Sequence, residues 1–480
     1  MKIVVIGCAP TALGFAHRLH ELQTFNDLAK DIELLVLEKE SFPGGLSCSV
    51  KDEKGFLWDM GGHITFNHNF PYYERAVTSA LPEWNKLKRN CQVDINYMFD
   101  EEGIHLVPYP AQFAIPLFPE KIKRKCLEDL MKRFDKNGDI LSTEEASHSF
   151  DGWILKHFGP TILDNFFKLY TKKVWTVETT EMSSNWVGTR VAMLPMKKLE
   201  QLCAASEDEL RNADFGWGPN AYFTFPKYGG TGAVWNAIAN QLPSKWLKYN
   251  SEVIKIDTKR KKLTYEEKVG NRREENTIDY DILVNTGPID QLVSSITSSI
   301  KLNLRFNKVC VIGVGLKQPM TSFLQQFTWL YFPDPSVPFF RVTIFSKYGE
   351  VTPDNNKFWS LMCECARPID DETTESEFRK LTIDGLIKKS MIESDQIVSV
   401  YSIILPYGYP IPTVQRDSTL SRIHQFLEER NIYSRGRFGG WKYECSNQDH
   451  CFMQGKELID RIIFDEPEKV YKTGVAMLRG

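Results

Sequence analysis

The first forty residues constrain the fold most, because signals for a strand, a turn, a helix and a second strand follow one another there. An apolar run, Lys2–Gly7, leads into a helical pattern that continues to about Leu22, and a second apolar run, Ile32–Leu37, ends at Glu38. In dinucleotide-binding units the helix N-terminus faces a pyrophosphate, and an acid after the second strand binds a ribose hydroxyl. The sequence therefore predicts a Rossmann-like unit at the N-terminus.

The glycine fingerprint of this unit is incomplete. Of the three glycine positions in G-x-G-x-x-G, only Gly7 is kept, and Ala9 and Ala12 occupy the other two. The second glycine normally lets the backbone approach the pyrophosphate, and the third lets the helix pack closely. Each alanine adds a methyl group at a crowded place, so we expect weakened rather than abolished binding.

The rest of the chain divides by its periodicity. Residues 112–206 show helical apolar spacing, for example over Trp153–Val174. Runs at Ser251–Ile256 and Ile282–Asn285 look like strands that return to the first unit, whereas strand signals alternate with turns over 309–404, as in an antiparallel sheet. We therefore expect an α/β protein with a Rossmann-like domain (1–88, 224–300 and 430–480), an inserted helical domain (112–205) and an antiparallel β-sheet domain (89–111, 206–223 and 301–429).

Composition excludes several classes of protein. The chain has 480 residues, of which 42% are hydrophobic, so it is globular and long enough for more than one core. A net charge of −3 gives no overall field that would attract nucleic acid or a membrane surface. The ten cysteines include no C-x-x-C pair, and no apolar run approaches the roughly 18 residues of a membrane helix. Because a strand begins at residue 2, leaving no room for a signal peptide, we expect a cytoplasmic protein.

Two metal-like patterns fail on their spacing. Asp135–Asp139 opens like a calcium loop, but Ile140 stands where the loop needs glycine and Ala146 where it needs glutamate. His63 and His68 lie five residues apart with no third ligand nearby in the sequence. We therefore expect no metal site.

The segment 434–453 combines a glycine-flanked arginine, Arg437, with two aromatic residues and the run Asn447-Gln448-Asp449. This segment resembles the C-terminal flavin signature of eukaryotic-type UDP-galactopyranose mutases. Further segments match that family in the same order along nearly the whole chain: 42–47, 59–63, 107–112, 149–153, 173–175, 216–221, 329–333, 340–341, 344–348 and 408–410.

The resemblance implies an FAD-dependent isomerase that interconverts UDP-galactopyranose and UDP-galactofuranose with no net redox change. In that family, N5 of reduced FAD bonds to the anomeric carbon of the sugar while UDP departs and is held for its return. FAD is the implied cofactor, NADPH its candidate reductant and a UDP-sugar the partner. The sequence leaves the preferred hexose and the oligomeric state open.

On the cofactor side, the family's residues carry over to two glycine loops, the N-terminal unit and the C-terminal segment. Glycines in these loops let the backbone lie against the flavin, where a Cβ atom would clash. Arg437 would favour an anionic reduced flavin. The residues expected to bind FAD are Gly7, Thr11, Glu38, Gly45, Leu46, Ser47, Gly61, Gly62, Arg437, Asn447 and Gln448.

On the substrate side, Arg341 is the expected ligand of the diphosphate, because a guanidinium pairs with phosphate oxygens through two N–H groups. Lys168 stands where the family has a second such arginine, and His63 would lie against the flavin and tune it rather than act as a general base. Uncharged donors to the diphosphate would be Tyr331, Tyr348, Tyr409 and Tyr443; Asn220 would position the sugar, and Tyr109, Gln112 and Phe150 would hold the uridine.

The chain departs from the family pattern at several of these places. Lysine at 168 keeps the charge but loses the bidentate geometry. Asp94 falls about where the family has an arginine for the NADPH phosphate, which a carboxylate would repel. The other departures are Ala111, Phe113, Thr171, Lys172 and Ser446.

Two other readings remain open. An FAD oxidoreductase of the amine-oxidase type would share the fold but leave Arg341 and the tyrosines unexplained. A nucleotide-sugar-binding relative that has lost its flavin would explain the two alanines but not Arg437 and Asn447-Gln448.

Overall fold

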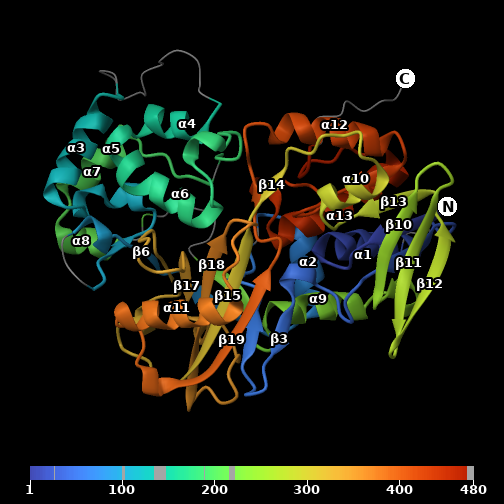
Figure 1. Ribbon diagram of the computed structural model, residues 1–480, viewed down its shortest axis with the longest axis horizontal. Coiled ribbons are helices and arrows are strands. Elements are labelled where there is room, and N and C mark those ends of the chain that lie inside the picture. Colours follow the sequence, from blue (N-terminus) through green and yellow to red (C-terminus); the bar gives the residue numbers. More distant parts are fainter. Residues whose placement is uncertain are drawn as a thin grey trace.

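Three regions with different secondary structure build the protein, as the computed structural model shows in Figure 1. A parallel sheet with its helices lies at one end, a group of helices lies at the other, and a larger sheet lies beside them. The 216–221 segment, which contains Asn220, and the 135–146 segment lie outside the described residues. The structure describes residues 1–25, 28–66, 68–99, 103–134, 148–188, 190–213, 215 and 222–472.

The predicted Rossmann-like unit is confirmed as a five-stranded parallel sheet. Helix α1 (Pro10–Phe25) connects its two N-terminal strands, and α13 (Gln448–Phe464) packs beside α1. The strands in spatial order are β21 (Ile432–Ser434), β13 (Ile282–Asn285), β1 (Lys2–Ile6), β2 (Glu33–Leu37) and β9 (Leu247–Lys248).

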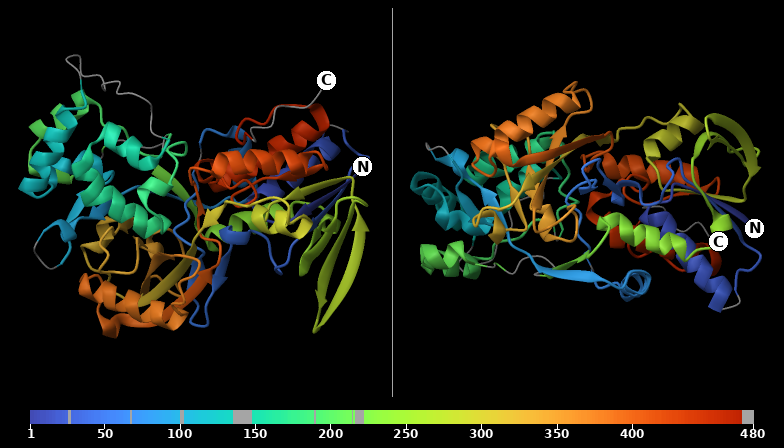
Figure 2. Two further views of the ribbon diagram at one scale, coloured as in Figure 1. Left: turned by 45° about the horizontal axis from the view of Figure 1, so that its top comes forward. Right: turned by 90° about the horizontal axis from the view of Figure 1, so that it is seen from below.

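Of the two later runs expected to return to the first unit, Ile282–Asn285 joins the parallel sheet, and 251–256 packs beside it, with Ile256 in one buried cluster with Val4 and Leu37. The run at 251–256 forms β10 (Ser251–Asp257), which pairs with β11 (Lys262–Val269) through a short turn, and β11 pairs in turn with β12 (Arg272–Asp279). This antiparallel sheet lies at the end of the molecule far from the helical region in every view (Figures 1 and 2). Local hairpin pairing explains why it is separate.

Helices α1 and α13 approach closely through two glycines. A Cβ atom on Gly14 would lie 2.0 Å from the carbonyl oxygen of Phe452, and one on Gly455 would lie 1.9 Å from the carbonyl oxygen of Thr11. The close contact therefore depends on Gly14 and Gly455 rather than on the third fingerprint position, where Ala12 is fully buried without a glycine.

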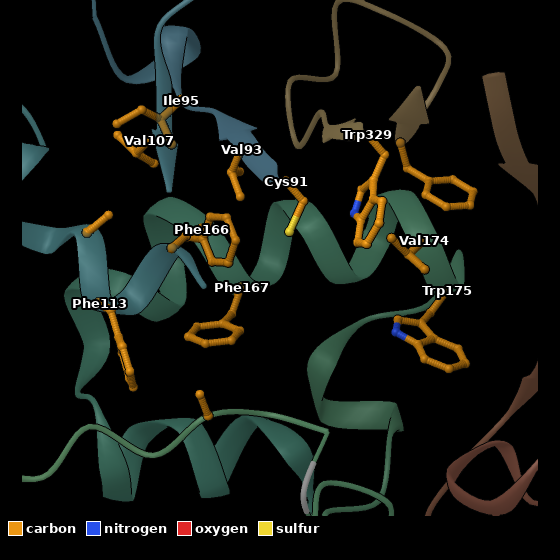
Figure 3. Packing of buried hydrophobic residues seen from close by; sticks show 14 of the residues in the cluster. Cys91, Val93, Ile95, Val107, Phe113, Phe166, Phe167, Val174, Trp175 and Trp329 are labelled. Carbon is orange, nitrogen blue, oxygen red and sulfur yellow. The ribbon is translucent and has the colours of Figure 1, made fainter. Parts of the chain in front are cut away.

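The helical region contains one irregular turn that orients its main helix. A π-helical turn, η4 (Leu163–Phe167), leads directly into α6 (Lys168–Trp175). Phe166, Phe167, Val174 and Trp175 point into a buried cluster shared with the larger sheet (Figure 3). The other helices are α3 (Glu120–Met131), α4 (Phe150–His157), α5 (Pro160–Ile162), α7 (Met196–Ala204) and α8 (Glu207–Arg211).

The larger sheet has seven strands and is mixed rather than purely antiparallel, because β6 and β16 run parallel. It is covered on both faces. Cys310, Ile312 and Leu316 face the core beneath α11 (Glu375–Lys388), while Val309 and Val311 face the cluster shared with the helical region. The strands in order are β19 (Ile397–Leu405), β15 (Lys308–Lys317), β18 (Phe358–Arg367), β17 (Arg341–Thr343), β16 (Trp329–Tyr331), β6 (Cys91–Asp94) and β7 (Leu106–Pro108).

Shorter elements connect these regions. No helix among the described residues is long and apolar enough to cross a membrane. All ten cysteines are free thiols. The connecting elements include η1 (Gly45–Ser47), β3 (Ser49–Lys51), β4 (Leu57–Asp59), α2 (Pro71–Ala80), β5 (Trp84–Lys88), η3 (Ala111–Leu117), β8 (Tyr222–Pro226), α9 (Gly230–Asn240), α10 (Ile289–Ile296), β14 (Arg305–Phe306), β20 (Pro410–Ile411), α12 (Arg416–Glu428) and η10 (Tyr443–Cys445).

The contact between α1 and α13 gives a stability test. Gly455→Ala should lower the free energy of unfolding by about 1–3 kcal/mol or more, because the added methyl group meets backbone atoms that cannot turn aside. Thermal unfolding followed by circular dichroism measures the loss. Gly270→Asn is the matched control, since Gly270 has φ +60° and open space around its Cβ position, and asparagine tolerates that backbone conformation. Equal melting temperatures for the two variants would contradict the packing argument.

Candidate active site

The glycine loop that follows β4 rests on the larger sheet at the site. The Gly62 N–H donates to Oε2 of Glu364 at 3.2 Å. A Cβ atom at Gly62 would lie 2.6 Å from Oγ1 of Thr343 and 3.1 Å from Nε of Arg341. Glycine is therefore required for the loop to lie this close to β17 and β18.

Arg341 and Glu364 form an ion pair beneath that loop. Nε and Nη2 of Arg341 both donate to the Glu364 carboxylate, the latter at 2.7 Å. The side chain of Arg341 is 20% exposed and that of Glu364 only 4%. Glu364 therefore fixes the guanidinium plane, and the edge formed by Nη1 and the second N–H of Nη2 remains for a ligand.

His63 follows the two loop glycines and is held neutral. Its Nδ1 is buried and has no hydrogen-bond partner among the described residues. Burial lowers the pKa of His63 to about 4; Glu364 opposes this shift, while Arg437 and Arg341 favour it. An imidazole that is uncharged at neutral pH does not add to the positive charge of the two arginines.

Tyrosine side chains from five parts of the chain lie around Arg341. The ring of Tyr331 lies 5.1 Å from that of Tyr109 and 5.9 Å from that of Tyr170, and the rings of Tyr409 and Tyr443 are 5.8 Å apart. Burial raises the pKa of Tyr331 to about 12 and also raises the pKa values of Tyr109, Tyr170 and Tyr409. These four hydroxyl groups therefore stay protonated at neutral pH and can donate hydrogen bonds.

Arg437 is a half-buried cation on the other side of these rings. Its guanidinium lies 5.2 Å from the ring centre of Tyr409 and 5.6 Å from that of Tyr443, and Nη1 donates to Oγ of Ser446 at 3.1 Å. Within the described ranges, it makes no ion pair. Serine at 446, where the family has glycine, thus supports Arg437, and the cation can bind a negatively charged group.

The N-terminal residues predicted to hold a dinucleotide meet at the C-terminal ends of β1 and β2. Gly7 has φ +90°, and a Cβ atom there would lie 2.6 Å from Oγ1 of Thr286. Glu38 is buried and accepts the Cys8 N–H at 2.7 Å, so it fixes the turn before α1. The first turn of α1 has no acidic residue, which leaves its positive dipole end suited to a diphosphate.

The remaining cofactor candidates lie around this turn. A Cβ atom on Gly45 would lie 3.1 Å from Cβ of Ala9, so the methyl group at the second fingerprint position faces η1, which contains Leu46 and Ser47. Thr11 lies against Gly436, where a Cβ atom would be 2.6 Å from its Oγ1. These close approaches form a backbone-lined cradle of the kind that a dinucleotide cofactor needs.

The predicted amides at the start of α13 are held by neighbouring side chains. Oε1 of Gln448 accepts the indole N–H of Trp235 at 2.8 Å. Oδ1 of Asn447 lies 3.3 Å from Nη2 of Arg190, a residue that the sequence analysis did not include. Arg190 also lies over the ring of Tyr443 at 5.3 Å and thereby links the helical region to this side of the site.

Lys168 does not face this site. Its ammonium group pairs with Asp164 at 2.6 Å, and its side chain is 45% exposed. The π-helical turn before it adds a residue to the helix turn and changes which side chains point inward. Tyr170, two residues later, faces Tyr331 instead. Tyr170 was not among the predicted residues, because the resemblance pointed to Lys168 in the same segment.

Other predicted substrate residues lie deeper than expected. Phe150 is 2% exposed and packs against Trp186 at 5.2 Å, while Gln112 is buried and donates to the Ala192 carbonyl at 2.9 Å. Tyr348 is 1% exposed, and its hydroxyl lies 3.5 Å from the Thr328 carbonyl oxygen. The structure brings Arg341, Tyr331, Tyr409 and Tyr443 together but encloses these three. Ala111, Phe113 and Thr171 are also buried.

The expectation that Asp94 would repel a nucleotide phosphate is wrong. Asp94 is fully buried and forms an ion pair with Lys389 at 2.7 Å, and it also accepts the His105 N–H at 2.9 Å. Lys389 pairs with Asp334 at 2.9 Å as well. The carboxylate is therefore neutralised inside the sheet and presents no charge to a ligand.

The buried His63 gives a test of how stability depends on pH. Because its folded pKa of about 4 lies below the ordinary value of 6.5, the unfolded chain takes up a proton first as the pH falls. His63 should therefore reduce stability between pH 6.5 and 4, by up to about 3 kcal/mol. Urea unfolding of the wild type and of His63→Gln at several pH values measures this; curves that stay parallel across that window would contradict it.

Comparison with known proteins identifies the family and the fold. The model of the family of flavin-containing amine oxidoreductases matches residues 18–336. The crystal structure of a reduced UDP-galactopyranose mutase superimposes with a TM-score of 0.86 and 34% identity, over 98% of this chain and 95% of that one.

More distant structures share the fold alone. A double mutant of putrescine oxidase gives a TM-score of 0.60 at 12% identity, over 96% of this chain and 99% of that one. A fatty acid isomerase from P. acnes gives 0.57 at 14% identity, over 96% and 98%. The family model and the 34% identical structure show that the chain belongs to the family of flavin-containing amine oxidoreductases and is similar to a UDP-galactopyranose mutase.

Proposed function

We propose that this protein is a UDP-galactopyranose mutase that interconverts UDP-galactopyranose and UDP-galactofuranose with FAD as its cofactor. The observation that carries the proposal is the position of Arg341, which lies among protonated tyrosines and directly beneath the Gly61–Gly62 loop. A cation next to uncharged donors suits a diphosphate that must leave the sugar and return to it. The similarity to a reduced UDP-galactopyranose mutase supports the same reading.

Arg341 would bind the diphosphate through its free edge. Glu364 occupies Nε and one N–H of Nη2, so the guanidinium is already oriented before the ligand arrives. Two N–H groups on the remaining edge can donate to two phosphate oxygens. Reduced FAD, when bound, supplies a nucleophilic N5 for the anomeric carbon. Arg341 would stabilise the negative charge that develops on UDP as the bond between the anomeric carbon and the diphosphate oxygen breaks.

The tyrosines would contribute hydrogen bonds without charge. With their pKa values raised, the hydroxyl groups of Tyr331 and Tyr409 donate to phosphate and do not repel it as phenolates would. Tyr443 and Tyr170 line the same space and are assigned to the same task. His63, which is neutral at physiological pH, would contact the flavin and tune it rather than act as a general base.

The cofactor would lie between the two glycine loops and the C-terminal segment. Gly7, Thr11 and Glu38 with η1 would bind the nucleotide half, and Gly61, Gly62 and Arg437 the flavin, with Asn447 and Gln448 at the start of α13. The close backbone approaches at the glycines and the Arg437 guanidinium, which makes no ion pair with any residue that the structure describes, both fit a dinucleotide with an anionic reduced flavin.

NADPH is the proposed physiological reductant, and the cytoplasm the proposed location. The burial and pairing of Asp94 remove the repulsion that the sequence suggested. A cytosolic pool of NADPH would also keep the ten free cysteines reduced.

A flavin oxidoreductase is the second candidate, because the matching family model describes amine oxidoreductases. That activity has no need for an arginine fixed among tyrosines, and it would proceed without a nucleotide sugar. A binding protein without flavin is a third reading, but it gives no role to the half-buried Arg437, which forms no ion pair within the described part of the chain.

The deciding experiment is a chromatographic assay of UDP-galactofuranose conversion with added FAD and excess dithionite. Dithionite reduces the flavin directly, so the result does not depend on NADPH. Formation of UDP-galactopyranose would establish the mutase. Bound, reduced flavin without conversion would refute it and favour the oxidoreductase, and absence of bound flavin would favour the binding protein.

Arg341→Ala should reduce kcat/KM by about 100- to 1000-fold, the usual cost of removing one donor that stabilises developing charge. The flavin absorption spectrum should be unchanged. Arg341→Lys is the matched variant, and its activity should fall between the two because lysine keeps the charge without the bidentate edge. Loss of flavin together with activity would show that the residue is structural.

The orientation of α6 predicts opposite effects at two neighbouring positions. Lys168→Ala should change kcat/KM by no more than about threefold, because an exposed ion pair contributes only about 0–1 kcal/mol. Tyr170→Phe, which keeps the packing but removes the hydroxyl, should lower kcat/KM about tenfold or more. A large loss of activity for Lys168→Ala with no loss for Tyr170→Phe would contradict this orientation of α6.

A further inference from the structure

Three potential metal ligands from two distant parts of the chain meet beside the flavin side of the site. His68 lies on the loop between β4 and α2, and Asp449 and His450 lie in the first turn of α13. One ligand atom from each residue lies within 4.8 Å of the other two. The sequence shows no third ligand near His68, because the other two residues lie about 380 positions away.

Hydrogen bonding satisfies one histidine and leaves the other unsatisfied. Nδ1 of His68 lies 2.7 Å from Oδ2 of Asp449, and the His68 backbone N–H donates to the same oxygen at 3.0 Å. Nδ1 of His450 is buried and has no hydrogen-bond partner among the described residues, since Oδ1 of Asp449 is 3.6 Å away. A buried ring nitrogen without a partner is costly unless a ligand meets it.

We infer that His68, Asp449 and His450 form a binding site for a divalent transition metal, of which Zn²⁺ is the best fit. Two imidazole nitrogens and one carboxylate oxygen are the ligand types that Zn²⁺ takes in three-ligand sites, with water at the fourth position. The inference does not depend on the proposed mutase activity.

The surroundings allow an ion to enter and keep the ligands available. The side chains of His68 and His450 are 24% and 14% exposed, whereas Asp449 is fully buried. Phe66, Phe70 and Tyr73 line the other sides, and Arg190 is the nearby cation that the ion must tolerate.

An ion at this site would tie the glycine loop to α13. His68 is five residues from His63 on the segment that also carries Gly61 and Gly62, and Asp449 follows directly after Asn447 and Gln448. Metal binding would therefore restrain the loop that lies over Arg341 against the helix that carries the predicted flavin amides.

The test is titration of the tag-free, flavin-loaded protein with Zn²⁺ by calorimetry, and with Co²⁺ by absorption spectroscopy. We expect one ion per chain and a Co²⁺ spectrum without thiolate charge-transfer absorption, which distinguishes the site from the exposed Cys203. His450→Ala and His68→Ala should each weaken binding by at least about tenfold.

His157→Ala is the matched control, because His157 also has a buried Nδ1 without a partner among the described residues but belongs to no cluster of ligands found there. It should bind Zn²⁺ as the wild type does. Circular dichroism melting identifies any variant that is unfolded. Because His68 and His450 lie on separate elements, the folded variant still tests the inference if the other variant does not fold. Equal Zn²⁺ binding by the wild type and both folded variants, or no binding by the wild type, would overturn the inference.

Discussion

The ion pair between Arg341 and Glu364 is the interaction on which the site depends, because its carboxylate also holds a glycine loop that is distant in the sequence. Glu364 lies on β18, Arg341 on the neighbouring β17, and the Gly62 N–H on the loop from β4 donates to the same carboxylate. Removing the carboxylate would leave a largely buried guanidinium and a backbone N–H without an acceptor. Breaking one side of a buried pair costs about 3–5 kcal/mol, so the geometry of the loop and the orientation of the arginine are coupled.

Packing around that pair explains why the helical region cannot be treated as an independent attachment. One buried cluster includes Phe166, Phe167 and Trp175 of the helical region together with Val93 and Trp329 of the sheet (Figure 3). The cluster continues to Trp58, which lies over Gly313 so closely that a Cβ atom there would be 2.4 Å from its ring. The tyrosines at the edge of this core therefore pack against rings that are themselves fixed, and this packing limits their rotamers.

Much of the fold follows from local pattern, and the parts that do not are set by long-range pairing. The strand, helix and strand of the N-terminal unit could be predicted because apolar periodicity and turn residues are local. The parallel contact of β6 with β16 joins strands that are far apart in the sequence, and the π-helical turn at Leu163–Phe167 has no comparable local signal. The same limit applies to the site: Arg341 and Arg437 could be proposed from short motifs, whereas Tyr170, Arg190 and Glu364 required the structure.

The distribution of charge shows what kind of ligand the site is built to receive. The positive charge of Arg341 is balanced by Glu364, whereas Arg437 and Arg190 form no ion pair with any residue that the structure describes, and both lie over the ring of Tyr443. Burial raises the pKa values of Tyr331 and Tyr409, which therefore remain protonated, and His63 remains neutral. The site therefore keeps an excess of positive charge in surroundings of low polarity, where each unpaired cation is costly. Binding of an anionic group offsets that cost, so the arrangement suits anionic ligands such as a diphosphate and an anionic cofactor.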